Sequence, residues 1–586
     1  MMSSRQSTEP FPVPSVQRLC DSFFFKLCLA LFFLLGLVLL LPFSQTALLS
    51  FGGRLAGKSI AVARWGEFLT EYGGKIVLTS LLLAVYVVRH RIETGSPASL
   101  PLFDRGFLLF ICAVWFAFVG ASVLLHEPWR DEVHAWTMAR AMTPAQLFHE
   151  MRYEGHFVPW FYLVFPFARL GFPVLTLNLI SFVIMGGCVF LLLFKSPFSI
   201  YAKAAVVLSV PMAYYYPAVS RCYCLYALCV LLLAWLFQRR TERPFLYALL
   251  LGLLANSHAY AEGMVAVLTA EFFCSGVVRP WKNLGREERR KRLLAVVLVC
   301  LFVLVAFLQV APAFGNTTAA SSRSRLTMDS FFSVVIEVFL ALDVSVLSQF
   351  LLLALVLVSF RCLVWHRQVG QLVIMDSSLL WMLLFAAVLY GASIPSRAWM
   401  WFFVFLFAVW QMGQTGRDGQ EAAQPVGPEA RAASTIIILV SLAAFNPAVS
   451  IRDWTGEFST AKSTAAFVAE NAWPGEPVLL PYAHQNYSLI FFAPSLGYKS
   501  LETGEDIRFF SWSREKEMSG YGDIHSCIKA RFDESGCDSL LIVGLNNGTT
   551  GFGAQLGYSC EELLQPGPSI SGESFSVLRV YDRISP

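Results

Sequence analysis

The segment RGFLLFICAVWFAFVGASVLL, residues 105–125, is followed directly by HEPWRDEVHAW, residues 126–136. The first segment is apolar over the roughly 20 residues that an α-helix needs to cross a hydrocarbon layer. The second segment brings several ionisable side chains together at the point where that helix would end. Ionisable groups near membrane depth are costly and usually mark a pathway or a site. This junction therefore predicts a membrane helix with a functional loop at its outer end.

The composition extends this prediction to the whole chain. Of its 586 residues, 56% are hydrophobic and 14% are charged, and the mean hydropathy is +0.59. Soluble globular chains carry about a quarter charged residues. We therefore expect an all-α polytopic membrane protein with about 13 transmembrane helices. The expected crossings are 22–45, 75–89, 105–125, 172–194, 204–218, 220–238, 245–258, 260–278, 292–312, 349–365, 371–393, 396–412 and 433–448.

The basic loops predict the orientation. Arg239, Arg240 and Arg243 lie in one expected loop, and the loop 279–292 is rich in Lys and Arg. The positive-inside rule places both loops in the cytoplasm. The N-terminus is then cytoplasmic and the chain after residue 449 periplasmic or lumenal, with 157–170 as a short helix at the outer interface. We expect the bacterial inner membrane, because no endoplasmic-reticulum retention tail is present, with the endoplasmic reticulum as the alternative. Membrane lipids are expected partners, and the net charge of +4 gives no reason to expect nucleic acid.

The tail differs in character from the rest of the chain. Residues 449–586 contain no run long enough to span a membrane, and Asp and Glu outnumber Lys and Arg. An apolar-periodic stretch at 465–470 predicts a helix capped near Ser459 or Thr460. We expect a small α/β domain on the outer face, with strands at 477–480, 539–543 and 575–581. The expected organisation is an N-terminal region with two crossings (1–104), a transmembrane core (105–448) whose first outer loop is 126–171, and this domain.

Within the first outer loop, Asp131 and Glu132 are the principal candidates for chemistry. On a helix, neighbouring residues point about 100° apart, so these two carboxylates would do different work. His134 lies three residues after Asp131, on the same helical face. The alternative is structural, because acidic residues are also favoured at the start of a helix.

Polar and charged residues also mark the other expected outer turns. They are Glu154 and His156 in the first loop, Arg221 and Tyr223 after residue 218, His258 at the next outer turn, and Arg397 before a late crossing. Each has a structural alternative. Arg221 could anchor a helix at the headgroups, Arg397 could belong to an aromatic belt, and His258 could be a polar contact between helices.

Taken in order, these motifs resemble the GT-C superfamily of integral-membrane glycosyltransferases. The likeness covers roughly residues 105–500 and is greatest to the protein O-mannosyltransferase-like and lipid A aminoarabinose transferase-like branches. It implies a polyprenyl-phosphate-linked sugar donor, a protein, lipid or glycan acceptor, and transfer with inversion at the outer membrane face. It also implies that Asp131, in an Asp131-Glu132 catalytic motif, is the general base. The implied substrate- and phosphate-binding residues are Arg221, Tyr223, Arg397, His134, Glu154, His156 and His258.

The sequence departs from this family in two ways. Two extra crossings precede the core, and no clear second acidic motif completes a metal site. A divalent ion held by His126, Asp131, Glu132, His134 and His156 is conceivable, but we expect no cofactor. Two other functions remain open: a transporter or flippase of lipid-linked sugars, and a non-catalytic scaffold. The absence of matched halves and the charges at one interface favour the enzyme.

Overall fold

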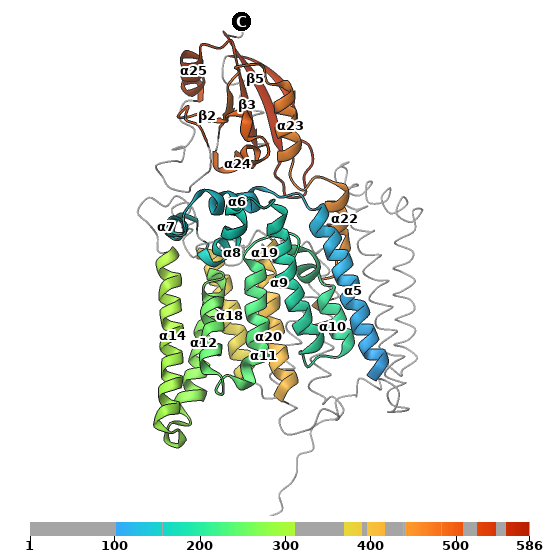
Figure 1. Cartoon of the computed structure of the whole chain (residues 1–586), viewed down its shortest axis with the longest axis vertical. Coiled ribbons are helices and arrows are strands. Elements are labelled where there is room, and N and C mark those ends of the chain that lie inside the picture. Colours follow the sequence, from blue (N-terminus) through green and yellow to red (C-terminus); the bar gives the residue numbers. More distant parts are fainter. Residues whose placement is uncertain are drawn as a thin grey trace, which may run out of the picture.

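The computed structural model describes residues 101–154, 156–310, 369–388, 395–415, 437–438, 440–441, 444–481, 483–507, 524–545 and 558–584. These residues form a bundle of apolar helices, a layer of three short helices across one end of it, and a small sheet domain beyond that layer (Figure 1). The predicted crossings 22–45, 75–89 and 349–365 lie outside the described residues.

Four helices of the described part are long and apolar enough to cross a membrane. They are α5 (Pro101–Leu125), α9 (Leu175–Phe194), a segment Ala259–Val278 that contains η3 (Ala259–Ala261), α13 (Glu262–Phe272) and η4 (Phe273–Val278), and α14 (Arg286–Val310). On α14, Leu301, Leu304 and Phe307 are more than half exposed, which suits a surface that faces lipid. The chain is therefore an integral membrane protein.

Further helices complete the described part of the bundle. They are α10 (Ile200–Val207), α11 (Tyr223–Leu236) with its extension η2 (Phe237–Arg239), α12 (Pro244–Ala255), α18 (Val369–Val388), α19 (Pro395–Ala398) and α20 (Met400–Thr415). A single 3-10 turn, η5 (Trp281–Asn283), precedes α14.

Two sequence predictions are wrong in detail. The expected crossing at 204–218 is broken: α10 ends at Val207, and a separate π-helical turn, η1 (Pro211–Tyr215), follows it. Pro211 has no N–H with which to continue α10, and the Val210 N–H bonds instead to the Ala444 carbonyl at 2.7 Å. The helix expected from residue 292 begins at Arg286, so its basic residues form the first turns of α14 rather than a loop.

Three short helices from the first outer loop form the middle layer (Figure 1): α6 (Arg130–Ala141), α7 (Pro144–Glu154) and α8 (Val158–Arg169). Helix α6 begins directly after Trp129, whose N–H bonds to the Glu132 carboxylate at 3.2 Å. Helix α8 begins where Gln309, near the end of α14, accepts the Val158 N–H at 2.8 Å. The prediction of a short helix at 157–170 is confirmed by α8.

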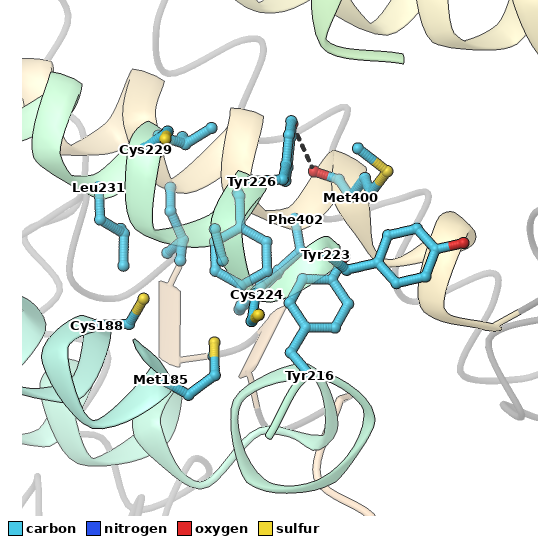
Figure 2. Close-up of a cluster of buried hydrophobic side chains, with 14 of the residues drawn as sticks. Met185, Cys188, Tyr216, Tyr223, Cys224, Tyr226, Cys229, Leu231, Met400 and Phe402 are labelled. Atoms are coloured by element: carbon cyan, nitrogen blue, oxygen red, sulfur yellow. Dashed lines mark hydrogen bonds between the residues drawn. The ribbon is translucent and has the colours of Figure 1, made fainter. Parts of the chain in front are cut away.

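Aromatic packing fixes α11 against α20. Figure 2 shows Tyr216, Tyr223 and Tyr226 in the buried cluster that includes Met400 and Phe402. The Tyr226 hydroxyl donates to the Met400 carbonyl at 3.2 Å, and the rings of Tyr216 and Tyr223 stack 5.8 Å apart. Tyr216 and Tyr223 flank the turn 217–222, and the Tyr216 hydroxyl donates to the Ser396 carbonyl of α19 at 2.9 Å, so the cluster joins that turn to α19.

The sheet domain has five strands in the order β2-β1-β3-β5-β4. Strand β1 pairs in parallel with β2 and β3, whereas β5 is antiparallel to β3 and β4. The strands are β1 (Val478–Leu480), β2 (Lys499–Ser500), β3 (Ser539–Leu545), β4 (Tyr558–Leu564) and β5 (Phe575–Ile584). The three predicted strands are confirmed. The edge strands β2 and β4 are not predicted, because β2 has two residues and β4 carries adjacent glutamates.

Helices cover both faces of the sheet. They are α23 (Ala461–Asn471) and α24 (Ala483–Phe492) on one face, α25 (Ile524–Ser535) on the other, and the turn η6 (Pro494–Leu496) after α24. The predicted helix at 465–470 is α23, and Ser459 accepts the N–H of its first residue, Ala461, at 3.1 Å. Helix α22 (Pro447–Thr455) precedes the domain and packs on α5, where Trp454 donates to Ser122 at 3.1 Å.

Candidate active site

Helix α6 directs its two adjacent carboxylates to different partners, as their spacing predicts. Asp131 pairs with Arg221, which lies in the turn before α11. Glu132 points to a different side of the helix and is fully buried. The two carboxylates therefore belong to two clusters, which we call the Asp131 cluster (Arg130, Asp131, His156, Arg221, Tyr223, His258 and Arg397) and the Glu132 cluster (His126, Glu132, Asn178, Tyr214, Ser220 and Asp453).

The Asp131 cluster is centred on the guanidinium group of Arg221. Its Nη1 donates to Asp131 Oδ2, and its Nη2 donates to His156 Nε2 at 2.7 Å. A guanidinium has no acceptor, so Nε2 must be the unprotonated nitrogen of the His156 ring. Burial, with the positive charges of Arg221 and Arg397, lowers the pKa of His156 well below its usual value. His156 is therefore a neutral acceptor at neutral pH.

Asp131 is ionised in this setting. Burial alone would raise the pKa of its carboxyl, but the positive charges of Arg221 and Arg130 outweigh burial and lower that pKa. Arg130 Nε also lies 3.4 Å from Asp131 Oδ1. The site thus contains a carboxylate, not a carboxylic acid, over the physiological pH range.

A second buried guanidinium completes the cluster. Arg397, in α19, donates from Nε to the Tyr223 hydroxyl at 3.3 Å. The Tyr223 ring lies 5.7 Å from the Arg221 guanidinium carbon and 5.4 Å from the His258 ring. The His258 and His156 rings are 6.1 Å apart. Residues from α6, the first loop, and three separate helix ends therefore meet at one end of the bundle.

Cations outnumber anions in the Asp131 cluster. Three guanidinium groups act on the one Asp131 carboxylate. Burial and the two nearby arginines, Arg397 and Arg221, also lower the pKa of His258 well below its usual value. His156 and His258 are therefore both uncharged at neutral pH. A site of this kind favours a multiply charged anion such as a phosphate, which guanidinium groups bind strongly.

His134 and Glu154 form a separate buried pair beside this cluster. His134 Nε2 lies 2.8 Å from Glu154 Oε1, so the pair joins α6 to the last residue of α7. Both side chains are nearly inaccessible to solvent. Their contact holds the first loop in shape next to Asp131.

In the Glu132 cluster, by contrast, each oxygen of the Glu132 carboxylate has two hydrogen-bonding partners. Glu132 Oε1 accepts from Asn178 at 3.1 Å and from the Ser220 N–H at 2.6 Å. Its Oε2 accepts from the Trp129 N–H at 3.2 Å and lies 3.0 Å from His126 Nε2. Because Ser220 immediately precedes Arg221, Glu132 fixes the turn that carries the central arginine of the other cluster.

His126 links Glu132 to a distant carboxylate. Its Nδ1 lies 2.8 Å from Asp453 Oδ2, 327 residues along the chain, and that oxygen also accepts from the Tyr214 hydroxyl at 3.0 Å. Burial disfavours the charged imidazole, but the Glu132 charge and the hydrogen bonds to both carboxylates raise the pKa of His126 to about 10. The His126 imidazolium, directly after α5, therefore forms buried ion pairs with Glu132 of α6 and Asp453 of α22.

Sequence analysis missed three of these polar partners: Asn178, Asp453 and Glu573, the last of which contacts the start of α6. Asn178 carried a signal, because a polar side chain inside an apolar crossing commonly bonds to a neighbouring helix. Asp453 and Glu573 carried none, since nothing local relates them to residues more than 300 positions earlier.

The described residues contain no group of three His, Cys, Asp or Glu side chains arranged to hold a metal ion. The five residues considered for a metal divide among three separate sets of contacts. His126 pairs with Glu132, Asp131 and His156 both contact Arg221, and His134 pairs with Glu154.

No family model matches the chain, and no curated protein matches it. Among solved structures, the chain is similar to ArnT from Cupriavidus metallidurans, in a crystal structure bound to undecaprenyl phosphate. The similarity covers 82% of this chain and 99% of that chain, at 12% sequence identity and a TM-score of 0.47. The chemistry of this site must therefore follow from its own geometry.

Proposed function

We propose that this protein is an inverting glycosyltransferase that moves a sugar from a polyprenyl-phosphate donor to an acceptor hydroxyl. The observation that carries the proposal is the Asp131 cluster itself. It holds a partly buried, ionised carboxylate against guanidinium groups, on the layer of loop helices that covers one end of an apolar bundle (Figure 1). A base beside a phosphate-binding group is what sugar transfer from a lipid phosphate requires.

The charges at the two ends of the bundle support a site on the outer face. At the end away from the sheet domain, Arg240 makes two hydrogen bonds to Glu271, at 2.7 and 2.9 Å. Arg292, in the first turns of α14, also donates to the Gly276 carbonyl of η4 at 2.6 Å. By the positive-inside rule this end is cytoplasmic. The Asp131 cluster and the sheet domain then lie on the outer side, periplasmic in the bacterial inner membrane that we favour.

In this proposal Arg221, Arg397 and Tyr223 bind the donor phosphate. Arg221 already donates from its two terminal nitrogens to Asp131 and to His156. A guanidinium group has five N–H donors, so an arriving phosphate shares Arg221 with these two partners. Partial neutralisation of Arg221 by the phosphate raises the pKa of Asp131 toward its ordinary value and makes it a better proton acceptor. Donor binding thus prepares the base.

Transfer then proceeds in one displacement. The acceptor oxygen forms a bond to the anomeric carbon as the bond from that carbon to the phosphate oxygen breaks, through an oxocarbenium-like state. Asp131 takes the acceptor proton, and the guanidinium groups of Arg221 and Arg397 stabilise the negative charge on the departing lipid phosphate. Glu132 acts by holding the Ser220–Arg221 turn. His134, Glu154, His156 and His258 shape the walls of the site, and no metal ion is required.

The acceptor class stays open among protein, lipid and glycan hydroxyls. The test is incubation of the purified protein in detergent with radiolabelled polyprenyl-phosphate sugars, and in parallel with nucleotide sugars. The proposal predicts consumption of the lipid-linked donor alone, unchanged by a chelator. Failure to consume any donor, together with movement of labelled lipid-linked sugar across vesicles that contain the protein, would favour the transporter.

A further inference from the structure

The sheet domain touches the helix that carries the proposed base. Glu573, in the turn before β5, is only 4% exposed. Its Oε2 accepts the backbone N–H of Arg130, the first residue of α6, at 3.2 Å. Its Oε1 accepts the Ser488 hydroxyl of α24 at 2.8 Å. A carboxylate from 443 residues later therefore lies at the start of α6, one residue from Asp131.

Glu573 is itself held in place by the sheet domain. The Thr460 N–H donates to the Glu573 carbonyl at 3.0 Å, and the Glu573 N–H donates to the Ser571 hydroxyl at 3.2 Å. Thr460 Oγ1 in turn accepts the Phe575 N–H at 2.9 Å. The position of the Glu573 carboxylate is thus set by the start of α23 and by β5.

The first N–H groups of a helix lack partners within the helix, and a negative charge beside them is favourable. The residue that precedes α6 is Trp129, and its side chain has no oxygen that could accept hydrogen bonds from these N–H groups. Glu573 supplies that acceptor to Arg130, whose side chain also contacts Asp131. The contact between the sheet domain and α6 is therefore linked to Asp131 through a single residue, Arg130.

We propose that Glu573 is a positioning residue for sugar transfer, and that the sheet domain sets the orientation of Asp131 through it. This inference rests on the proposed function. The sheet domain then contributes to catalysis by orienting Asp131, in addition to any surface that it offers to the acceptor. Any acceptor that shifts the domain on α6 alters the geometry of the base.

The test compares Glu573→Ala and Glu573→Gln with a control, Lys462→Ala. Lys462 belongs to the same domain and contacts the first loop through Glu127 at 3.2 Å, but its side chain is 65% exposed and Glu127 lies outside α6. Two readouts are taken on the full-length protein: amide hydrogen exchange of the peptide covering 130–136, and kcat and KM for the donor. We expect Glu573→Ala to speed exchange in that peptide about tenfold and to lower kcat about tenfold with KM unchanged, in line with loss of a helix cap.

The Glu573→Gln variant distinguishes positioning of α6 by Glu573 from a role in which Glu573 only attaches the sheet domain. Its amide oxygen can still accept the Arg130 N–H, so exchange and kcat should stay within about threefold of the wild type. Lys462→Ala should change neither. The inference is overturned by an unchanged kcat in Glu573→Ala. It is also overturned if both Glu573 variants speed exchange throughout the sheet domain, because the residue then only holds the domain together.

Failure of this inference is distinguishable from failure of the proposed function. If the wild type transfers sugar and Glu573→Ala does so equally well, only the positioning role is lost. If the wild type transfers sugar from no donor, both proposals are overturned. Faster exchange at 130–136 in Glu573→Ala would then still report the contact as a structural one.

Discussion

Two charged clusters lie on different sides of one short helix, α6, and they are built in opposite ways. In the Glu132 cluster every Glu132 oxygen has two hydrogen-bonding partners, and His126 is shared between two carboxylates. In the Asp131 cluster three guanidinium groups act on a single carboxylate. The Glu132 carboxylate is satisfied within the protein, whereas the Asp131 cluster has positive charge in excess.

This difference separates a scaffold from a site. A buried ionic group with all its hydrogen bonds made has nothing left to offer a ligand, and its removal leaves its partners uncompensated. A cluster with excess positive charge gains when an anion arrives. Adjacent residues of identical chemistry, Asp131 and Glu132, are therefore expected to fail in different ways when they are replaced.

The largest effect is expected from breaking the Glu132 cluster. Glu132→Ala leaves His126, Asn178 and the Ser220 N–H without their acceptor, and should lower the free energy of unfolding by about 3–5 kcal/mol. Thermal unfolding in detergent, followed by circular dichroism, measures it beside Asp131→Ala. Equal losses of stability in the two variants would contradict the distinction between the clusters.

Breaking the other cluster should affect turnover instead. Arg221→Ala removes the guanidinium that contacts both Asp131 and His156, and should reduce kcat/KM by about a hundred- to a thousandfold. The matched control is Arg240→Ala, which removes a partly buried guanidinium–carboxylate contact at the opposite end of the bundle. Similar losses of kcat/KM in both variants would show that Arg221 acts through stability alone.

The sequence predicts the residues of the Asp131 cluster but not the division between the clusters. Asp131, Arg221 and His258 stand out because each is polar beside an apolar run, so their approach at one membrane face follows from topology. That Glu132 belongs to the scaffold depends on Asn178, which bonds to it, and on Asp453, which is linked to it through His126. Both contacts arise only through tertiary packing. Helical periodicity gives the angle between Asp131 and Glu132, but not what lies on either side.

Much of the fold follows from the sequence for the same reason. Long apolar runs such as α5 and α9 are predicted within a few residues, because a span must be continuous. The break at Pro211 is missed, since hydropathy does not register a lost backbone hydrogen bond. Strand β4 is missed because its two adjacent glutamates hide the alternation of an edge strand.

The two clusters should also respond differently to alkali. The folded-state pKa of His126 is raised to about 10, above its ordinary value of 6.5, so its contribution to stability is complete below 6.5 and lost as pH rises through 10. The melting temperature of the wild type should therefore fall between these values, whereas that of His126→Asn should change less. Identical pH profiles for the two proteins would exclude this role for His126.

The smallest effect is expected at the exposed contact between the sheet domain and the first loop. Lys462→Ala removes an ion pair with Glu127 in which the lysine side chain is mostly solvated, and should change the free energy of unfolding by no more than about 0.5 kcal/mol. Denaturation measured beside Glu132→Ala would show the contrast. If Lys462→Ala lowered the free energy of unfolding nearly as much as Glu132→Ala, the surface ion pair, rather than the buried hydrogen bonds of Glu132, would hold the loop.

The most direct test of the central claim is transfer of radiolabelled sugar from a polyprenyl-phosphate donor by purified wild type and Asp131→Asn, with thermal unfolding of both. Asparagine keeps the size of the side chain but cannot take a proton at neutral pH. We predict that wild type consumes the donor and that Asp131→Asn is slower by about a thousandfold at unchanged melting temperature. Equal turnover by the two proteins would contradict the assignment of Asp131 as the base.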